Sequence, residues 1–554
     1  MHTRRIVAAA LASFLSSWPL GCATTPPAPA ESKAQLFDGM GSYRRPTSTS
    51  NAEAQRYFDQ GHLWAYAFNH DEAVRSFEKA AELDPTFALA WWGVALCHGP
   101  HINNPVMTEE RSRLAYDAAA KATALAAHAP PMERDLVVAV AARYAWPAPA
   151  DRRPLDEAYA AAMERVHRTY PTDNDIATLY AESLMDLQPW DLWTLEGTPK
   201  GRTLEIVALL EGVLARDPSH PGAAHLYIHA VEASNDPGRA KREAAFLRTA
   251  VPASGHLTHM PSHIDVRVGA WSAAAVANRN AIAADAAYRR LSPRQDFYQG
   301  YMLHNNQFLA FTCMMLGRSE EAIDAGQAAV STLPPEWIEK NASLIDGYMT
   351  VHMDALKRFG RWDDLLALEM PPPYLPYTRA MWRFNRAVAL AAKGDLTGAE
   401  AERAAFVAAV AQVPATSIAQ INPASRVLEL AALMLEGEIA YARKDYAVAE
   451  RALRDAVAIE DTLLYMEPPD WMQPVRHTLG VVLLDAGKPA DARRVYEEDL
   501  RRWPENGWSL VGVAAACDAL CDTAGAADAR DRAARAWPDA DITPHATCLC
   551  APQR

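Results

Sequence analysis

The sequence predicts an all-α fold that forms a solenoid of stacked helical hairpins. Half of the 554 residues are hydrophobic, and Ala-rich stretches with few β-branched runs favour helices that pack through small side chains. A chain of this length exceeds one ordinary compact core, whereas a solenoid grows by adding units. The pair His225 and His229 is followed 34 residues later by His259 and His263. This spacing is the period of a helix–turn–helix repeat.

The N-terminus has the pattern of an export signal. Arg4 and Arg5 precede an apolar run over residues 6–15 that is too short to span a bilayer as a mature helix. We therefore expect residues 1–21 to be a signal peptide that is removed from the mature protein.

Cys22 follows this segment directly. The stretch Leu20-Gly21-Cys22 resembles a bacterial lipobox, in which the Cys becomes the lipidated first residue, although Pro19 stands where Leu is usual. The resemblance implies a periplasm-facing lipoprotein of the bacterial cell envelope, with the lipid as its membrane anchor. Residues 22–51, which begin rich in Pro and Ala, would be a flexible tether. Cleavage without lipidation is the alternative.

A repeat signature begins shortly after this tether. Small and large residues stand at fixed spacing and a Pro ends the unit, at Tyr57, Gly61, Trp64, Ala73, Phe77, Ala80 and Pro85. This pattern resembles the tetratricopeptide repeat, in which small residues lie where two helices touch and large ones fill the space between them. Similar patterns return around Gly437 and Gly480. The resemblance implies a right-handed superhelix whose concave groove receives a partner protein or peptide.

The clarity of the repeat varies along the chain. We expect N-terminal repeats with a long Pro-interrupted insertion over residues 52–170, and central repeats over residues 171–345. C-terminal repeats follow over residues 346–540, and a tail over residues 541–554. Four of the cysteines lie near or in this tail, so a disulfide staple is expected there with its pairing open.

Composition and motifs exclude several functions. The net charge of −14 and the absence of a basic stripe argue against nucleic acid as a partner. No apolar run after the signal is long enough for a transmembrane helix. The sequence contains no nucleophile elbow, phosphate-binding Gly loop or dinucleotide fingerprint, so hydride and phosphoryl transfer are not supported.

The repeat register places the histidines on one wall of the groove. In the tetratricopeptide family the second, fifth, ninth, twelfth and thirteenth places of the first helix face the groove, and the resemblance puts six imidazoles on these places in successive units. They are His225, His229, His256, His259, His263 and His304. The carboxylates Glu182, Asp186 and Glu232 fall on the same wall. His62 also takes a groove-facing place, but we expect it to lie far from the cluster.

This collection of side chains predicts a metal site. Imidazole is the commonest protein ligand for transition metals, and facing helices with His and carboxylate side chains can hold one or two ions. The six histidines would be the ligands, and Glu182, Asp186 or Glu232 would bridge, orient or carry a proton. The ion would be copper, iron, zinc or manganese, and the protein a metal-dependent oxidoreductase with catalytic residues unassigned.

Two alternatives to a metal site stay open. The groove could hold a small-molecule or peptide ligand without a metal, or the histidines could serve only in repeat packing. The protein would then be a non-catalytic interaction scaffold of the cell envelope. Pro261 adds a local ambiguity, because it either breaks a helix that carries His259 and His263 or begins a new helix between them.

Overall fold

The structure is a computed structural model that describes residues 34–293 and 295–551. The predicted signal peptide and Cys22 lie outside the described residues, so both stay predictions. Within those ranges the chain forms helices, with no strand, which confirms the all-α class. None of the helices described there is long and apolar enough to cross a membrane.

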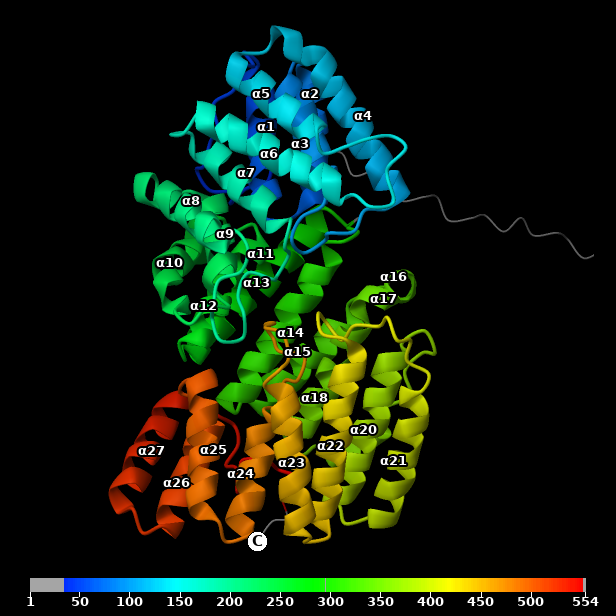
Figure 1. Cartoon of the computed structure of the whole chain (residues 1–554), viewed down its shortest axis with the longest axis vertical. Coiled ribbons are helices and arrows are strands. Elements are labelled where there is room, and N and C mark those ends of the chain that lie inside the picture. The colour runs from blue at the N-terminus through cyan, green and yellow to red at the C-terminus, as the bar shows by residue number, and fades with distance from the viewer. Residues whose placement is uncertain (1–33, 294, 552–554) are drawn as a thin grey trace, which may run out of the picture. The chain divides into compact units, whose positions relative to one another are not determined.

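The first half of the chain forms hairpins from consecutive helices (Figure 1). Its helices are α1 Ala52–Tyr66, α2 His70–Leu83, α3 Ala88–His98, α4 Glu109–Leu125, η1 Ala126–His128, α5 Pro131–Ala141, α6 Arg153–Thr169, α7 Asn174–Met185, α8 Thr203–Arg216, α9 Pro221–Val231, η2 Pro237–Ala240, α10 Lys241–Ala250, α11 Gly255–His259, α12 Pro261–Arg267 and α13 Trp271–Leu291.

The second half continues in the same way. Its helices are α14 Gln299–Leu316, α15 Ser319–Ser331, α16 Pro335–Lys340, α17 Ala342–Ile345, η3 Asp346–Thr350, α18 Val351–Arg358, α19 Trp362–Ala367, α20 Pro376–Ala392, α21 Leu396–Val410, α22 Ala424–Ala442, α23 Tyr446–Glu460, α24 Val475–Asp485, α25 Pro489–Arg502, α26 Gly507–Ala519 and α27 Thr523–Ala536. Successive hairpins contact one another, as a tetratricopeptide-like repeat requires.

The signature residues pack as the repeat pattern predicts. Ala73, Phe77 and Ala80 are fully buried, and the Phe77 ring lies against two glycines. A Cβ at Gly61 would come within 2.9 Å of that ring, and one at Gly93 within 2.6 Å. The helices therefore approach so closely that only a residue without a side chain fits at these places.

The predicted insertion differs from the structure. The Pro-rich stretch begins helix α5 at Pro131, and α5 pairs with α6. Pro is favoured at the first position of a helix because its missing N–H would have no partner there. The prolines therefore start a hairpin at this point, where the sequence suggested an interruption.

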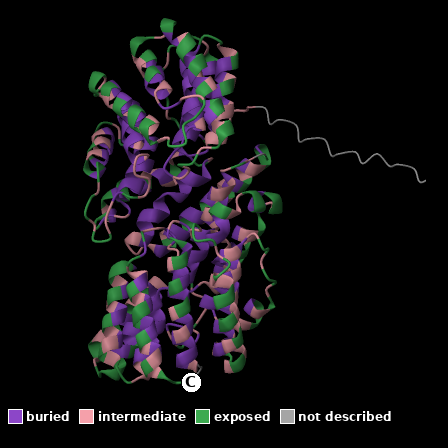
Figure 2. Cartoon of the chain, turned by 45° about the vertical axis from the view of Figure 1, so that its right-hand side comes forward, coloured by how far each residue is buried: buried purple, intermediate pink, exposed green. Residues whose placement is uncertain are grey.

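Contacts between distant segments enclose the interior. Near the N-terminus, the Tyr288 hydroxyl of α13 donates to Glu72 of α2, and α1 contacts α9. In the second half, the Trp508 indole of α26 donates to the Met314 carbonyl of α14. An open solenoid makes contacts only between neighbouring units. Here helices far apart in the sequence contact one another, so that the repeats close on themselves and the inward faces of the helices are buried (Figure 2).

Candidate metal centre

Three neighbouring segments bring the six predicted histidines together. Helix α9 carries His225 and His229, the α11–α12 segment carries His256, His259 and His263, and α14 carries His304. Their ligand nitrogens form two groups of three, each with all its nitrogens within 4.8 Å of one another. Apart from His304, which is half-buried, the side chains are almost completely buried. The cluster is thus an enclosed chamber, which differs from the open concave groove of the sequence prediction.

The α9 pair is placed by regular helix geometry. Pro221 occupies the first turn of α9, and the His220 side chain caps it by accepting from the Ala223 N–H. His225 and His229 stand four residues apart, so both rings project from one face of the helix. Their ring centroids lie 4.9 Å apart.

The structure resolves the ambiguity at Pro261. Helix α11 ends at His259 and α12 begins at Pro261, joined by Met260 in the right-handed helical conformation. The Ser262 hydroxyl donates to the His259 carbonyl. The junction keeps the rings of His259 and His263 together, with centroids 4.8 Å apart.

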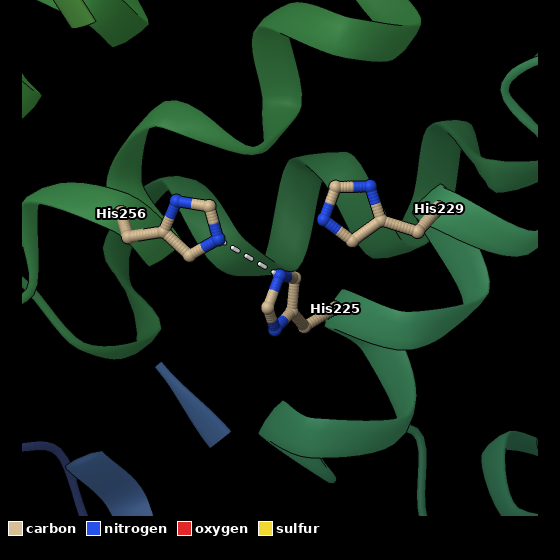
Figure 3. Close-up of side chains that lie close together, drawn as sticks. All are labelled: His225, His229 and His256. Carbon is tan, nitrogen blue, oxygen red and sulfur yellow. Dashed lines mark hydrogen bonds between the residues drawn. The ribbon is translucent and has the colours of Figure 1, made fainter. Parts of the chain in front are cut away.

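The first group of imidazoles is His225, His229 and His256, and their rings converge from α9 and α11 (Figure 3). His225 Nδ1 lies 2.7 Å from the Tyr66 carbonyl oxygen. Since that oxygen can only accept, Nδ1 carries the hydrogen and Nε2 keeps a free lone pair. This Nε2 lies 3.1 Å from His256 Nε2. Within the described residues, His229 Nε2 is buried without a hydrogen-bond partner.

The second group is His259, His263 and His304. His259 Nδ1 lies 2.7 Å from Asn278 Oδ1, so His259 Nε2 also carries a lone pair. His263 Nδ1 faces two carboxylates, and its Nε2 lies 2.9 Å from His259 Nε2. Two neutral rings would point lone pairs at each other there. Either an extra proton or a metal cation between the nitrogens removes this repulsion.

Glu232 links the two groups. Its Oε1 accepts from His229 Nδ1 at 2.8 Å, and its Oε2 lies 2.6 Å from His263 Nδ1. Glu467, from the loop before α24, comes within 3.3 Å of His263 Nδ1. Both carboxylates therefore contact Nδ1, and Nε2 is the nitrogen that faces the other imidazoles. Such contacts at Nδ1 fix the tautomer and the orientation of a ring that binds metal.

Burial and these carboxylates set the protonation states. Burial lowers the pKa of His225, His256 and His259 well below the ordinary value, and that of His304 to about 3. Burial also disfavours the charged form of His263, but Glu232 and Glu467 outweigh it and raise its pKa to about 10. Most of the rings are thus neutral, the form that binds metal.

One nitrogen–nitrogen distance in each group fits coordination to a common ion. Metal–imidazole bonds of about 2.0–2.1 Å place two ligand nitrogens about 2.9 Å apart at a right angle and about 3.4 Å apart at the tetrahedral angle. The two observed Nε2–Nε2 distances, 3.1 and 2.9 Å, lie in or at the edge of this range. A nitrogen-rich ligand set suits copper, zinc and iron, whereas manganese prefers oxygen.

Aromatic and apolar side chains surround the chamber. The Phe68 ring contacts the rings of the first group, with its centroid 4.5 Å from that of His225, and Trp190 meets His229 edge-on. A cavity of about 10 Å³ borders His229 and Glu232. This volume is about that of one water molecule, so the chamber admits only a small molecule beside the rings.

Two predicted carboxylates have another role. Asp186 forms an ion pair with the buried Arg143 guanidinium. Glu182 lies in the same charged group, where burial raises its pKa to about 8 and Asp186 adds to the shift. Neither belongs to a ligand group found in the described residues. Of the three predicted carboxylates, Glu232 alone reaches the imidazoles, and Asp186 is instead paired with Arg143 of the α5–α6 connection.

Sequence reasoning missed three partners of the cluster. Glu467, Asn278 and the Tyr66 carbonyl each contact a ligand ring. Distance along the chain hid Glu467 and Tyr66, since only closure of the winding brings α1 and the loop before α24 to α9 and α12. Asn278 lies on α13, directly after α12, but no motif marks its amide as a partner of His259. The polar composition of the Glu467 loop is the one signal the sequence offered.

Comparison with known proteins identifies no family. No protein-family model and no curated protein matches the chain. A solved structure of a human IFIT1 dimer with m7Gppp-AAAA is 12% identical, covers 88% of this chain and 91% of its own, and has a TM-score of 0.33. The Cut9–Hcn1 structure is 14% identical, with coverage of 88% and 78% and a TM-score of 0.32. Yeast Tom70 is 10% identical, with coverage of 86% and 90% and a TM-score of 0.29. The chain is thus defined by its own geometry, as a helical-repeat protein with a buried imidazole–carboxylate cluster.

Proposed function

We propose that the protein is a metalloprotein that holds one late first-row transition metal ion at each group of three imidazoles. The observation that carries the proposal is the approach of His259 Nε2 to His263 Nε2 while the Nδ1 atoms of both rings face acceptors. A metal cation would take the place of the extra proton that the raised pKa of His263 puts between these two nitrogens. Its charge would also balance the buried carboxylates Glu232 and Glu467.

Different residues of the chain would have different roles at the metal site. The imidazoles would bind the ions, and Glu232, Asn278 and the Tyr66 carbonyl would orient the rings through Nδ1. Phe68 and Trp190 exclude bulk water, and the small cavity beside His229 leaves room for one small reactant. Bound copper or iron would supply electron-transfer chemistry, as an oxidoreductase requires, whereas zinc would act as a Lewis acid.

Elemental analysis of untagged protein tests the proposal. Protein purified without a polyhistidine tag and without chelators should contain about two equivalents of copper, zinc or iron by mass spectrometry of the elements. Protein stripped with chelator and exposed to each ion should regain the same amount of the native metal. Preparations that contain no metal and take up none would reject the metal centre and leave the interaction scaffold, a helical-repeat protein that binds protein or peptide partners.

Export and lipidation form a separate proposal, supported by Arg4, Arg5 and the lipobox-like Cys22. Expressed in a bacterial host, the wild-type protein should sediment with membranes and carry fatty acid at residue 22. Cys22→Ser should lose the lipid signal by mass spectrometry and move to the soluble fraction. Wild-type protein that is cleaved but unlipidated would refute the anchor and keep the export signal.

A further inference from the structure

A second cluster of reactive side chains lies in the C-terminal half, among residues that the metal centre does not use. Cys548 and Cys550 of the tail form a disulfide. Their Sγ atoms and a carboxylate oxygen of Glu438, from α22, all lie within 4.8 Å of one another. We propose that this pair is a thiol–disulfide exchange site, with Glu438 as its proton carrier and a low-molecular-weight thiol as its reaction partner.

The tail is held in place by hydrogen bonds to the surrounding helices. Thr547 Oγ1 donates to the His477 carbonyl of α24 at 2.6 Å and lies 2.7 Å from the Tyr496 hydroxyl of α25. The Arg358 guanidinium of α18 donates to the Thr547 carbonyl. These contacts fix the residue next to Cys548 from three sides, so the sulfur atoms keep a defined position beside Glu438.

The two sulfur atoms have different surroundings. Cys548 Sγ accepts from the Cys550 N–H at 3.2 Å and from Gln473 Nε2 at 3.9 Å. Such donors stabilise a thiolate. Cys550 is 8% exposed and Cys548 4% exposed. Both cysteines are buried, and the hydrogen-bond donors on Cys548 make it the sulfur that leaves, so an external thiolate attacks Cys550.

Glu438 is suited to carry the proton. It is buried, and its Oε2 has no hydrogen-bond partner among the described residues. Burial raises the pKa of this carboxyl to about 7, against the opposing charge of Lys357. Both protonation states are thus populated near neutral pH, which a group that gives and takes protons needs.

The exchange is balanced with two thiols. A thiolate attacks Cys550 Sγ and forms a mixed disulfide, while the electron pair of the broken bond moves to Cys548 Sγ, which takes a proton from Glu438. A second thiolate attacks the external sulfur and releases Cys550 as a thiolate. The two protons lost by the external thiols on ionisation return to Cys550 and to Glu438. The protein disulfide is reduced to two thiols and the two external thiols are oxidised to one disulfide.

Kinetics of reduction test the proposal on the full-length oxidised protein. Reduced glutathione is added near neutral pH, and samples are quenched by alkylation. The mass of the C-terminal peptide is then measured by mass spectrometry. Cys548 and Cys550 should become alkylated together in the wild type. Glu438→Gln should slow this step about tenfold or more, because general acid catalysis contributes roughly that much or more. Glu436→Gln, on the same helix, should react as the wild type does.

Two further measurements separate chemistry from folding. Circular dichroism should show unchanged helix content in Glu438→Gln, and Glu438→Asp, which keeps a carboxyl, should recover part of the rate. If Glu438→Gln reacts as fast as the wild type, or if the disulfide stays oxidised in excess glutathione, the exchange site is refuted. Should Glu438→Gln fail to fold, the reduction rates of Glu438→Asp and Glu436→Asp are compared. A slower rate in Glu438→Asp supports the exchange site, and equal rates refute it.

Discussion

Replacing one histidine in each group should abolish metal binding and leave the fold in place. His225→Gln with His259→Gln keeps side chains of similar length but removes the two imidazoles whose Nδ1 contacts are to Tyr66 and Asn278. Each group then retains two imidazoles, too few for tight binding of a divalent ion. The metal content, measured on untagged protein, should fall to background, whereas the wild type should hold about two equivalents.

Thermal unfolding with and without metal gives the second readout. An ion that binds only the folded protein stabilises it by about 4 kcal/mol when its free concentration is a thousand times the Kd. The wild type should show this increase and the double variant almost none. A matched pair, His128→Gln with His545→Gln, changes two exposed histidines and should keep the full effect. Equal metal content in both variants would contradict the assigned ligands.

Repeat periodicity explains why the sequence predicted much of the fold. The positions of Gly61, Ala73 and Phe77 are fixed by contacts inside one hairpin and with the next one, and such local contacts leave a regular spacing in the sequence. The same periodicity placed His225 and His229 beside the α11–α12 histidines, because equivalent positions of adjacent units lie one helix-packing distance apart. The His part of the site could therefore be predicted.

The enclosure of the site could not be predicted, because it depends on contacts with no sequence period. Trp508 reaches Met314, and Glu467 reaches His263, only after the repeats have wound back on themselves. The curvature per repeat that decides such closure is a sum of small rotations. The sequence pattern does not encode these rotations, and small errors in predicting each one add up along the chain.

The position of His62 shows the same limit. Its place in the first unit predicted a groove-facing histidine without a His neighbour, far from the cluster. In the structure its Nε2 lies 2.9 Å from Asp175 of α7, whose Oδ1 also accepts from the Tyr66 hydroxyl at 2.6 Å. The backbone carbonyl of that same tyrosine contacts His225. A carboxylate on α7 thus anchors the residue that contacts His225, one of the proposed metal ligands.

Asp175→Asn should therefore be the most destabilising single change in this part of the protein. Besides His62 and Tyr66, the carboxylate contacts the Tyr43 hydroxyl and the Arg45 guanidinium, which lies 2.6 Å away. Burial disfavours its charge, but His62 and Arg45 outweigh burial and hold the pKa of Asp175 well below its ordinary value. Removing the charge leaves the buried Arg45 with only Asp173, 3.1 Å away, as a carboxylate partner. The cost should therefore lie at or below the lower end of the range for an unpaired buried charge, about 3 kcal/mol.

Urea unfolding against pH checks both the size and the sign of this effect. A carboxylate with a depressed pKa in the folded state contributes its stability above the ordinary aspartate pKa, about 3.9, and loses it as the pH falls through the folded value. The difference in unfolding free energy between the wild type and Asp175→Asn should thus be largest at pH 7 and should shrink below about pH 4. Asp324→Asn, at an exposed carboxylate, should change stability by less than about 0.5 kcal/mol. If Asp175→Asn lowers the unfolding free energy at pH 7 no more than this control does, Asp175 does not hold α1 against α7. Tyr66 would then need another anchor to orient His225.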